Sequence, residues 1–374
     1  MVRKVRFVEP AKLYRMIKDE LDGAYFEVMS KGDLIDRGQL RRFEENLASF
    51  VGTKYAVGLN SGYDALHLSL RAAGVGPGDE VIVPAHTFVA TASAVVNVGA
   101  KPVLVDVGTD FNINERLIEE ALTAKTKAIL PVHLSGYMAD MVRVMELAEK
   151  HHLTVVEDAC QSLGASMTDG AGRRRMAGAW GLTGCWSFYP FKILGGYGDG
   201  GAVTTDDEDV ALFVRRMRYN GEDRNTGEYH GHGFTCLLDN LQAAFLDIKL
   251  RYLPKWIERR KTIAERYRKA LSDIDDLLLP HYDDARRVHV YQNYTVRSKQ
   301  ENEFSEYLKK NGVEVLTQFR KPYYRHEALK LQDRGFPETE ALSREVCSLP
   351  MNVEIDDQDV DYVISIVKRF YGRA

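Results

Sequence analysis

The sequence predicts an α/β fold in which a mixed, mostly parallel sheet is flanked by helices and followed by a smaller α+β C-terminal domain. Two observations predict the sheet. Short apolar strands alternate with helices of about ten residues, which is the arrangement of βαβ crossovers. The strands are also nearly continuous apolar runs, as expected when helices cover both faces. Because this pattern changes after residue 275, we predict a large domain over 1–250 and a small domain over 251–374.

The charge balance and the cysteines exclude several classes of protein. With a net charge of −4, the chain lacks the basic excess that binds nucleic acid or an anionic membrane. Its N-terminus is charged where a signal peptide needs an apolar core, and no apolar run reaches membrane-spanning length. The four cysteines are far apart and form no Cys-x-x-Cys pair, which argues against a zinc site or disulfide framework. We therefore expect a cytoplasmic protein without a metal site.

Helical periodicity opens the chain. Apolar residues near helical spacing predict helices over 11–30 and 38–50. A short strand over 55–57 then leads through a turn into a helix over 64–73, which glycines terminate. The alternation that predicts the sheet continues with strands over 81–83, 103–106, 127–132 and 153–157 and with helices over 91–98 and 139–151.

The second half of the chain is more helical. A helix over 207–220 precedes a polar, glycine-rich loop. Another helix is predicted over 240–250, and Pro254 opens a separate, longer one. The predicted small domain consists of a half-buried strand over 289–298, a helix over 303–312, a strand over 313–319 and a closing helix over 356–371.

Lys192 stands out in an apolar and aromatic stretch. It is the only charged residue from Gly181 to Gly198, and five of the seven residues over 195–201 are glycine. Burying a lysine costs free energy and lowers its pKa unless it is paired. Such a lysine either reaches water at the edge of a core strand or is kept for amine chemistry. The stretch alone does not decide between these alternatives.

Two other features have both a structural and a functional interpretation. The turn Asn60-Ser61-Gly62 precedes a helix, whose N-terminus offers free N–H groups to a phosphate. A plain capped helix is the simpler interpretation. Asp158 follows a predicted strand, at the edge where ligands of parallel sheets bind. On local grounds a helix cap is favoured there, and the alternative is a carboxylate that faces a cationic ligand atom.

Taken together, these segments resemble the sugar aminotransferases of the DegT/DnrJ/EryC1/StrS group. The resemblance covers nearly the whole chain. It implies a pyridoxal-phosphate enzyme of the aspartate-aminotransferase fold type, with a large cofactor-binding domain and a homodimer whose active sites lie at the interface. The matching segments include NSGYDALHLSLRAAGVGPGDEVIVPAHTFVAT, GAKPVLVDV, ILPVHLSGYMADM, VVEDACQSLGA, GCWSFYPFKILGGYGDGGAVTT, LDNLQAA and LSREVCSLPMNVEIDDQDVDYVI.

The resemblance assigns roles around the ring of the cofactor. Lys192 matches the lysine that forms a Schiff base with the cofactor aldehyde and then, once freed, carries a proton as general base and acid. Asp158 matches the carboxylate that faces the pyridine nitrogen, which reverses the preference for a helix cap. Gln161 matches a residue on the side of the ring hydroxyl, and Phe88 matches the aromatic residue that stacks on the ring.

The resemblance also assigns a phosphate site. Gly62, Tyr63 and Asp64 match the turn that holds the phosphate through backbone N–H groups, and Ser187 matches a hydroxyl donor to it. Two departures affect side-chain contacts. Tyr63 stands where the family often has threonine, and Thr235 replaces an asparagine that reaches the partner subunit's phosphate. Thr235 still offers a hydroxyl donor.

The function implied is a pyridoxal-phosphate-dependent transfer of an amino group from L-glutamate or glutamine to a keto-sugar. The expected acceptor is a nucleotide-linked 3- or 4-keto-6-deoxyhexose of polysaccharide or lipopolysaccharide biosynthesis. The alternatives are a cyclitol ketone aminotransferase and a non-catalytic, regulatory pyridoxal-phosphate-binding protein. Sugar dehydratases of the same fold have a histidine in place of Lys192, so Lys192 argues against that activity. Arg215, Arg216 and Arg218 are interpreted as a solvated face rather than as a diphosphate site.

Overall fold

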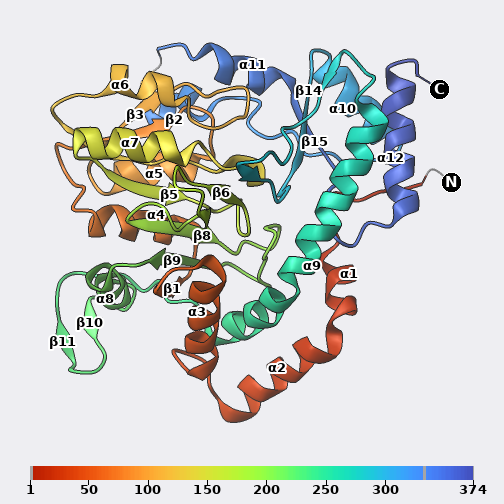
Figure 1. Cartoon of the computed structure of the whole chain (residues 1–374). Coiled ribbons are helices and arrows are strands. Elements are labelled where there is room, and N and C mark those ends of the chain that lie inside the picture. Colours follow the sequence, from red (N-terminus) through yellow and green to blue (C-terminus); the bar gives the residue numbers. More distant parts are fainter. Residues whose placement is uncertain (1–2, 332–333, 374) are drawn as a thin grey trace.

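A seven-stranded sheet forms the centre of the computed structural model, which describes residues 3–331 and 334–373 (Figure 1). The strand order is β1-β9-β8-β5-β4-β2-β3. Every neighbouring pair is parallel except the two pairs that β9 forms, which confirms the mixed, mostly parallel sheet. The strands are β1 (Tyr55–Leu59), β2 (Glu80–Pro84), β3 (Lys101–Val105), β4 (Thr126–Ile129), β5 (Thr154–Asp158), β8 (Thr183–Ser187) and β9 (Gly201–Thr205).

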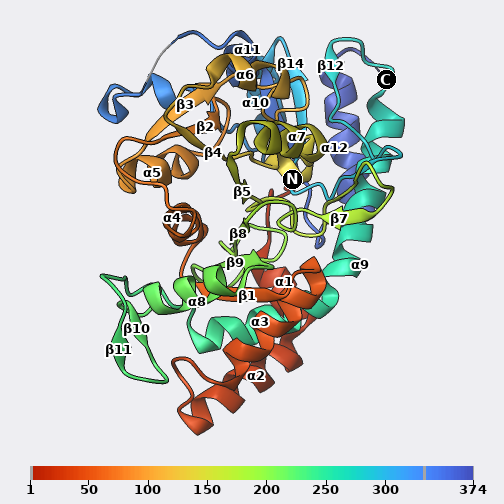
Figure 2. The same cartoon turned by 60° about the vertical axis from the view of Figure 1, so that its left-hand side comes forward.

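Helices cover both faces of this sheet, which explains why its strands are apolar on both sides. Because side chains alternate along a strand, Ala56 of β1 packs with one helix layer, whereas Val57 and Leu59 pack with the other. The two layers are seen from a second direction in Figure 2. The first layer is α3 (Gly38–Val51), α7 (Met141–His151) and the N-terminal half of α9 (Asn240–Leu271), and the second is α4 (Gly62–Ala72), α5 (Val89–Asn97) and α8 (Glu208–Met217).

The open edge of β1 is closed by a buried ion pair. Glu44 of α3 accepts the N–H of Gly58 at 2.8 Å, and Arg218 donates to the Gly58 carbonyl at 2.9 Å. The two side chains also bind each other, at 2.5 Å. An edge strand otherwise leaves backbone groups unpaired, and a buried ion pair needs further hydrogen bonds of this kind. The ion pair therefore satisfies the unpaired backbone groups of Gly58, and these backbone groups supply the further hydrogen bonds that the buried ion pair needs.

The parallel strands bring the predicted site residues to one edge of the sheet. Gly62 follows β1, Phe88 follows β2, Asp158 ends β5 and Ser187 ends β8. The carboxyl ends of parallel strands meet at the same edge, where ligands of such sheets bind. Residues that are up to about 125 positions apart in the sequence therefore share one surface.

The C-terminal part has its own apolar cluster around a three-stranded antiparallel sheet, ordered β12-β14-β15. Val5 from the N-terminus belongs to this cluster and forms a parallel bridge with Val313. The sheet and its helices are β12 (Leu277–Leu278), β14 (Tyr294–Ser298), β15 (Val346–Leu349), α10 (Glu301–Lys310) and α12 (Asp357–Phe370). The remaining elements are α1 (Pro10–Met16), α2 (Lys18–Lys31), α6 (Ile118–Ala121), α11 (Pro337–Glu345), β6 (Ser166–Thr168), β7 (Arg174–Met176), β10 (Glu222–Asp223), β11 (Glu228–Tyr229) and β13 (Arg287–Val288).

Three predictions of individual elements were wrong. Helices over 240–250 and from Pro254 form one helix, α9, because buried Leu253 and Trp256 hold the chain on both sides of the proline. The helix over 11–30 breaks at Ile17, whose φ of −131° and ψ of 28° are not helical. The strand over 313–319 forms only isolated bridges. The division into two domains remains a proposal, and its boundary at residue 250 lies inside α9.

Candidate active site

Lys192 lies on the loop that follows β8. The side chain is half-buried, and its backbone N–H donates to the Tyr189 carbonyl at 2.8 Å. Burial lowers the pKa of the Lys192 amine, although Cys160 and Asp158 act in the opposite direction. A neutral amine is the form that attacks an aldehyde. The structure therefore supports the interpretation of Lys192 as a reactive amine.

Asp158 is a buried carboxylate that forms no ion pair in the described part of the chain. Only 6% of the residue is exposed. Its Oδ2 accepts the Thr91 hydroxyl at 2.8 Å, and the Thr87 hydroxyl lies 3.0 Å from that of Thr91. Its Oδ1 accepts the backbone N–H of Cys160 at 3.3 Å. Buried charges are normally paired, so this arrangement suits a cationic atom of a bound group.

The turn before α4 is pressed against β8 and β9. The Ser61 hydroxyl accepts the backbone N–H of Asp64 at 3.1 Å and donates to its carboxylate at 2.6 Å. A Cβ on Gly62 would lie 2.8 Å from both Cys160 Sγ and Ser187 Cβ, so only glycine fits there. Because Ser61 already occupies the Asp64 N–H, the backbone donors left for an anion are those of Gly62 and the next residue, Tyr63.

The other predicted residues differ in their surroundings. Phe88, the residue before α5, is 58% exposed and leaves its ring free for stacking. The Gln161 side chain accepts the Ser135 N–H at 2.9 Å. Thr235 is exposed and donates to Asn220 at 3.1 Å. No described contact joins Thr235 to Lys192 or to the other predicted site residues. The predicted role of Thr235 toward a partner subunit stays a prediction.

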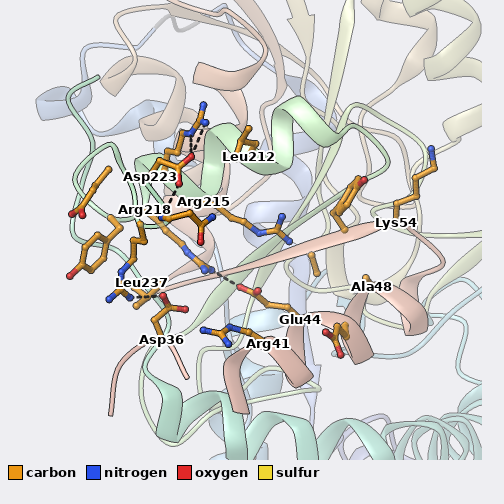
Figure 3. Close-up of a pocket in the computed structure, with 18 residues that line it drawn as sticks. Asp36, Arg41, Glu44, Ala48, Lys54, Leu212, Arg215, Arg218, Asp223 and Leu237 are labelled. Carbon is orange, nitrogen blue, oxygen red and sulfur yellow. Dashed lines mark hydrogen bonds and ion pairs between the residues drawn. The ribbon is translucent and has the colours of Figure 1, made fainter. Parts of the chain in front are cut away.

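Two open clefts, of about 580 and about 590 Å³, lie apart from Lys192. The first is the charged cleft between α3 and α8 in Figure 3. It contains no predicted site residue, and its Arg216 and Arg218 are paired with Asp223 and Glu44. The pairing of both arginines argues against a diphosphate site, but the interpretation of Arg218 as part of a solvated face was wrong, because this residue is only 6% exposed. The second cleft is lined by Tyr63 and other residues of α4 and α5.

Sequence reasoning missed the side chains that hold the Lys192 loop in place. Thr91 was also missed, although it lies one helical turn after Phe88. None of these residues has a local signal, because they act on backbone or carboxylate groups 45 to 101 positions away. The loop contacts are Gln292 with the Phe191 carbonyl and the Ile193 N–H, Gln242 with the Tyr197 N–H, and Lys249 with the Gly195 carbonyl.

Comparison with known proteins assigns the family. Residues 15–368 match the model of the DegT/DnrJ/EryC1/StrS aminotransferase family. The chain belongs to this family. Similar proteins include the dTDP-3-amino-3,4,6-trideoxy-alpha-D-glucose transaminase of Streptomyces venezuelae, 37% identical over 99% of this aminotransferase and 97% of that protein. A Geobacillus stearothermophilus protein named "Pleiotropic regulatory protein" is 36% identical over 98% of both chains.

Solved structures support the same assignment. Streptomyces venezuelae DesV in complex with a ketimine intermediate has a TM-score of 0.94 and 36% identity, over 99% of both chains. Bacillus subtilis ntda with bound cofactor PMP has a TM-score of 0.91 and 28% identity, over 100% of this aminotransferase and 86% of that chain. This aminotransferase is therefore a pyridoxal-phosphate enzyme of the predicted fold.

The residues described above fit this cofactor. Bound pyridoxal phosphate supplies an aldehyde for amines and a ring that accepts electron density during transamination. The carboxylate of Asp158 suits a protonated ring nitrogen, and the amine of Lys192 suits the aldehyde. The Gly62 turn and the Ser187 hydroxyl supply donors for a phosphate. The glycine at 62 keeps the turn free of a side chain that would fill this cradle.

Replacing Thr91 by valine tests how Asp158 is held. Valine keeps the shape of threonine but removes the hydroxyl that donates to the carboxylate, and a hydrogen bond to a charged group is worth about 1.5–3 kcal/mol. We expect kcat to fall about tenfold or more, whereas Thr91→Ser keeps the donor and most of the activity. Steady-state kinetics with L-glutamate measures both. Equal rates for the two variants would contradict a role for this hydroxyl.

Proposed function

We propose that this aminotransferase transfers an amino group from L-glutamate or glutamine to a nucleotide-linked keto-sugar, a 3- or 4-keto-6-deoxyhexose. The observation that carries the proposal is the pair formed by Lys192, an amine whose pKa burial lowers, and Asp158, a buried carboxylate for which no ion pair is described. The name of the Streptomyces venezuelae relative, a 3-amino sugar transaminase, favours amination at C3.

The proposed roles follow from the placement of each side chain. Lys192 binds the cofactor and, once displaced by the amino donor, moves a proton at the substrate carbon. Asp158, held by Thr91, keeps the ring nitrogen protonated. Phe88 stacks on the ring, and Gln161 contacts it on the side of the ring hydroxyl. Backbone donors of Gly62 and Tyr63, together with the Ser187 hydroxyl, orient the phosphate, whereas the Asp64 N–H donates to Ser61.

We also propose a homodimer in which Thr235 reaches the partner's cofactor. Large aromatic side chains are exposed beside the site, including Phe88, Tyr189 and Phe191 at 58%, 48% and 48%. A cluster of exposed aromatic side chains is typical of interaction sites. The described cysteines are all free, which supports a reducing, cytoplasmic location. Sedimentation equilibrium tests the dimer, and a monomer at micromolar concentration would contradict it.

An absorbance experiment tests the function. Protein loaded with pyridoxal phosphate should absorb in the visible, and L-glutamate should bleach this band as the cofactor becomes pyridoxamine phosphate. Keto-sugar nucleotides then restore the band only if they accept the amino group. Protein that never becomes coloured, or a band that no amino donor changes, would overturn the proposal.

The same experiment separates the alternatives. A cyclitol ketone aminotransferase would recover its band with a keto-cyclitol and not with a sugar nucleotide. The regulatory alternative has the name of the Geobacillus stearothermophilus relative in its favour. A purely regulatory protein would bind the cofactor without any response to amino donors. The environments of Lys192 and Asp158 favour catalysis.

A further inference from the structure

A second lysine, Lys249, is more deeply buried than Lys192. It lies on α9 and is 2% exposed. No carboxylate of the described residues forms an ion pair with it. Its Nζ donates to the Gly195 carbonyl at 2.7 Å and lies 3.7 Å from the centre of the Tyr197 ring. Burial lowers the pKa of Lys249 to about 8, although Glu354 acts in the opposite direction. Burying an ammonium in this way is costly, and an apolar residue of similar length would avoid the cost.

The contact of Lys249 is with the loop that carries Lys192. Gly195 follows Lys192 by three residues, and a Cβ on Gly195 would lie 2.3 Å from the Pro190 carbonyl oxygen. The loop is therefore folded tightly on itself, and the N–H of Gly196 donates to the Phe188 carbonyl at 2.7 Å. Because the loop is this compact, a displacement of the Gly195 carbonyl also displaces the backbone of Lys192.

Lys249 and Lys192 line the same small cavity of about 40 Å³ beside the loop, together with Arg260 and Glu354. Arg260 is buried and donates to the Tyr291 carbonyl at 2.9 Å. The charge interactions of the Lys192 amine are instead with Cys160 and Asp158. The described contacts of Lys249 with this loop are made at Gly195 and Tyr197, so Lys249 acts on Lys192 through the loop backbone.

We propose that Lys249 is a positioning residue, whose ammonium holds the Gly195 carbonyl and thereby keeps the Lys192 amine directed toward Asp158. Gln242 and Gln292 hold other backbone groups of the loop, but Lys249 is the charged member of this set. A charge-assisted hydrogen bond is stronger than a neutral one. That the loop position matters for activity rests on the proposed function of Lys192. That Lys249 anchors the loop does not depend on that function.

Hydrogen–deuterium exchange on the full-length, cofactor-free protein tests the anchoring. Lys249→Met removes the donor and keeps the length of the side chain. We expect the backbone amides of residues 193–198 to exchange at least about tenfold faster than in the parent protein, since local opening follows the loss of such contacts. The matched control is Lys255→Met, which replaces an exposed lysine of the same helix and should leave exchange unchanged.

Folding is checked separately by the melting temperature and circular dichroism. If Lys249→Met does not fold, Lys249→Gln is used, because it is also uncharged and cannot keep an ammonium donor at Gly195. Unchanged exchange of residues 193–198 in a folded variant would overturn the proposal. Faster exchange spread equally over the whole chain would also overturn it, because it indicates general destabilisation.

A second measurement follows the attachment of the cofactor. Pyridoxal phosphate is added, borohydride fixes it onto Lys192, and mass spectrometry measures the modified fraction over time. We expect attachment in Lys249→Met to be at least about tenfold slower, with Lys255→Met equal to the parent. Equal rates would overturn the positioning of Lys192. If the parent protein itself is not modified at Lys192, the proposed function fails, and exchange still decides whether Lys249 anchors the loop.

Discussion

Replacing Lys192 by alanine is expected to lower kcat for transamination by about 10³- to 10⁴-fold, since the variant loses the general acid and base of the proton transfer. It also loses the amine that holds the cofactor aldehyde. Because burial lowers the pKa of Lys192, the parent protein should attach the cofactor well below the ordinary lysine pKa of about 10.4. The measurements are steady-state kinetics and mass spectrometry after borohydride reduction.

The control for this prediction is Lys255→Ala, in which an exposed lysine is removed. It should keep the parent rate and become modified at Lys192. Lys192→Ala should keep its fold, because a half-buried lysine contributes little packing that an alanine cannot replace. Modification of another lysine together with a rate within tenfold of the parent would refute the assignment of Lys192.

Replacing Asp158 by asparagine should have the second-largest effect, a loss of about 10²- to 10³-fold in kcat, comparable to the removal of a preorganised charge-stabilising group. Asparagine keeps the shape and still accepts the Thr91 hydroxyl, but it does not stabilise a protonated ring nitrogen. KM for L-glutamate should change much less than kcat, since Asp158 is proposed to contact the cofactor and not the donor. Stopped-flow measurement of the donor half-reaction gives both values.

Asp158→Glu is the matched variant, because it keeps the negative charge and changes only its distance. It should retain more activity than Asp158→Asn. An Asp158→Asn variant with a kcat within threefold of the parent, a change of less than about 1 kcal/mol in the barrier, would show that this carboxylate does not act on the ring nitrogen.

The positions of the site residues were easier to predict than the residues that hold them in place. Asp158 follows a predicted strand, so the alternation of strands and helices places it at the ligand-binding edge of the sheet. Ser187 ends β8, a strand that was not predicted. Local reasoning favoured a helix cap for Asp158, and in the structure its Oδ1 does accept the nearby Cys160 N–H. Its other oxygen is held by Thr91, which is 67 residues away. Contacts of this range, like that of Lys249, depend on the tertiary fold and leave no local signal.

Five of the seven strands of the central sheet were predictable because both faces of the sheet are buried, which forces apolar strands; β8 and β9, on either side of the Lys192 loop, were not predicted. The failures occur where local rules conflict with packing. Proline disrupts a helix by removing one N–H and crowding the preceding turn, yet buried residues on both sides of Pro254 keep α9 continuous. The strand β15 has only four residues, too few for a periodic pattern. Phe319, with a φ of 59°, leaves the extended conformation that its segment predicted.

The pairing of β1 with β9 has a consequence for the order in which the chain folds. Tyr55 is paired with Thr205, so about 150 residues must be ordered or looped out before this pair forms, at a cost in chain entropy. The edge of β1 also needs Glu44 and Arg218, which come from opposite sides of that long segment. We therefore expect the Gly62 turn to reach Ser187 late in folding. A nascent chain that ends before residue 218 lacks the Arg218 contact at the edge of β1. We therefore expect such a chain to bind the cofactor poorly, so that cofactor binding would indicate that the large domain is complete.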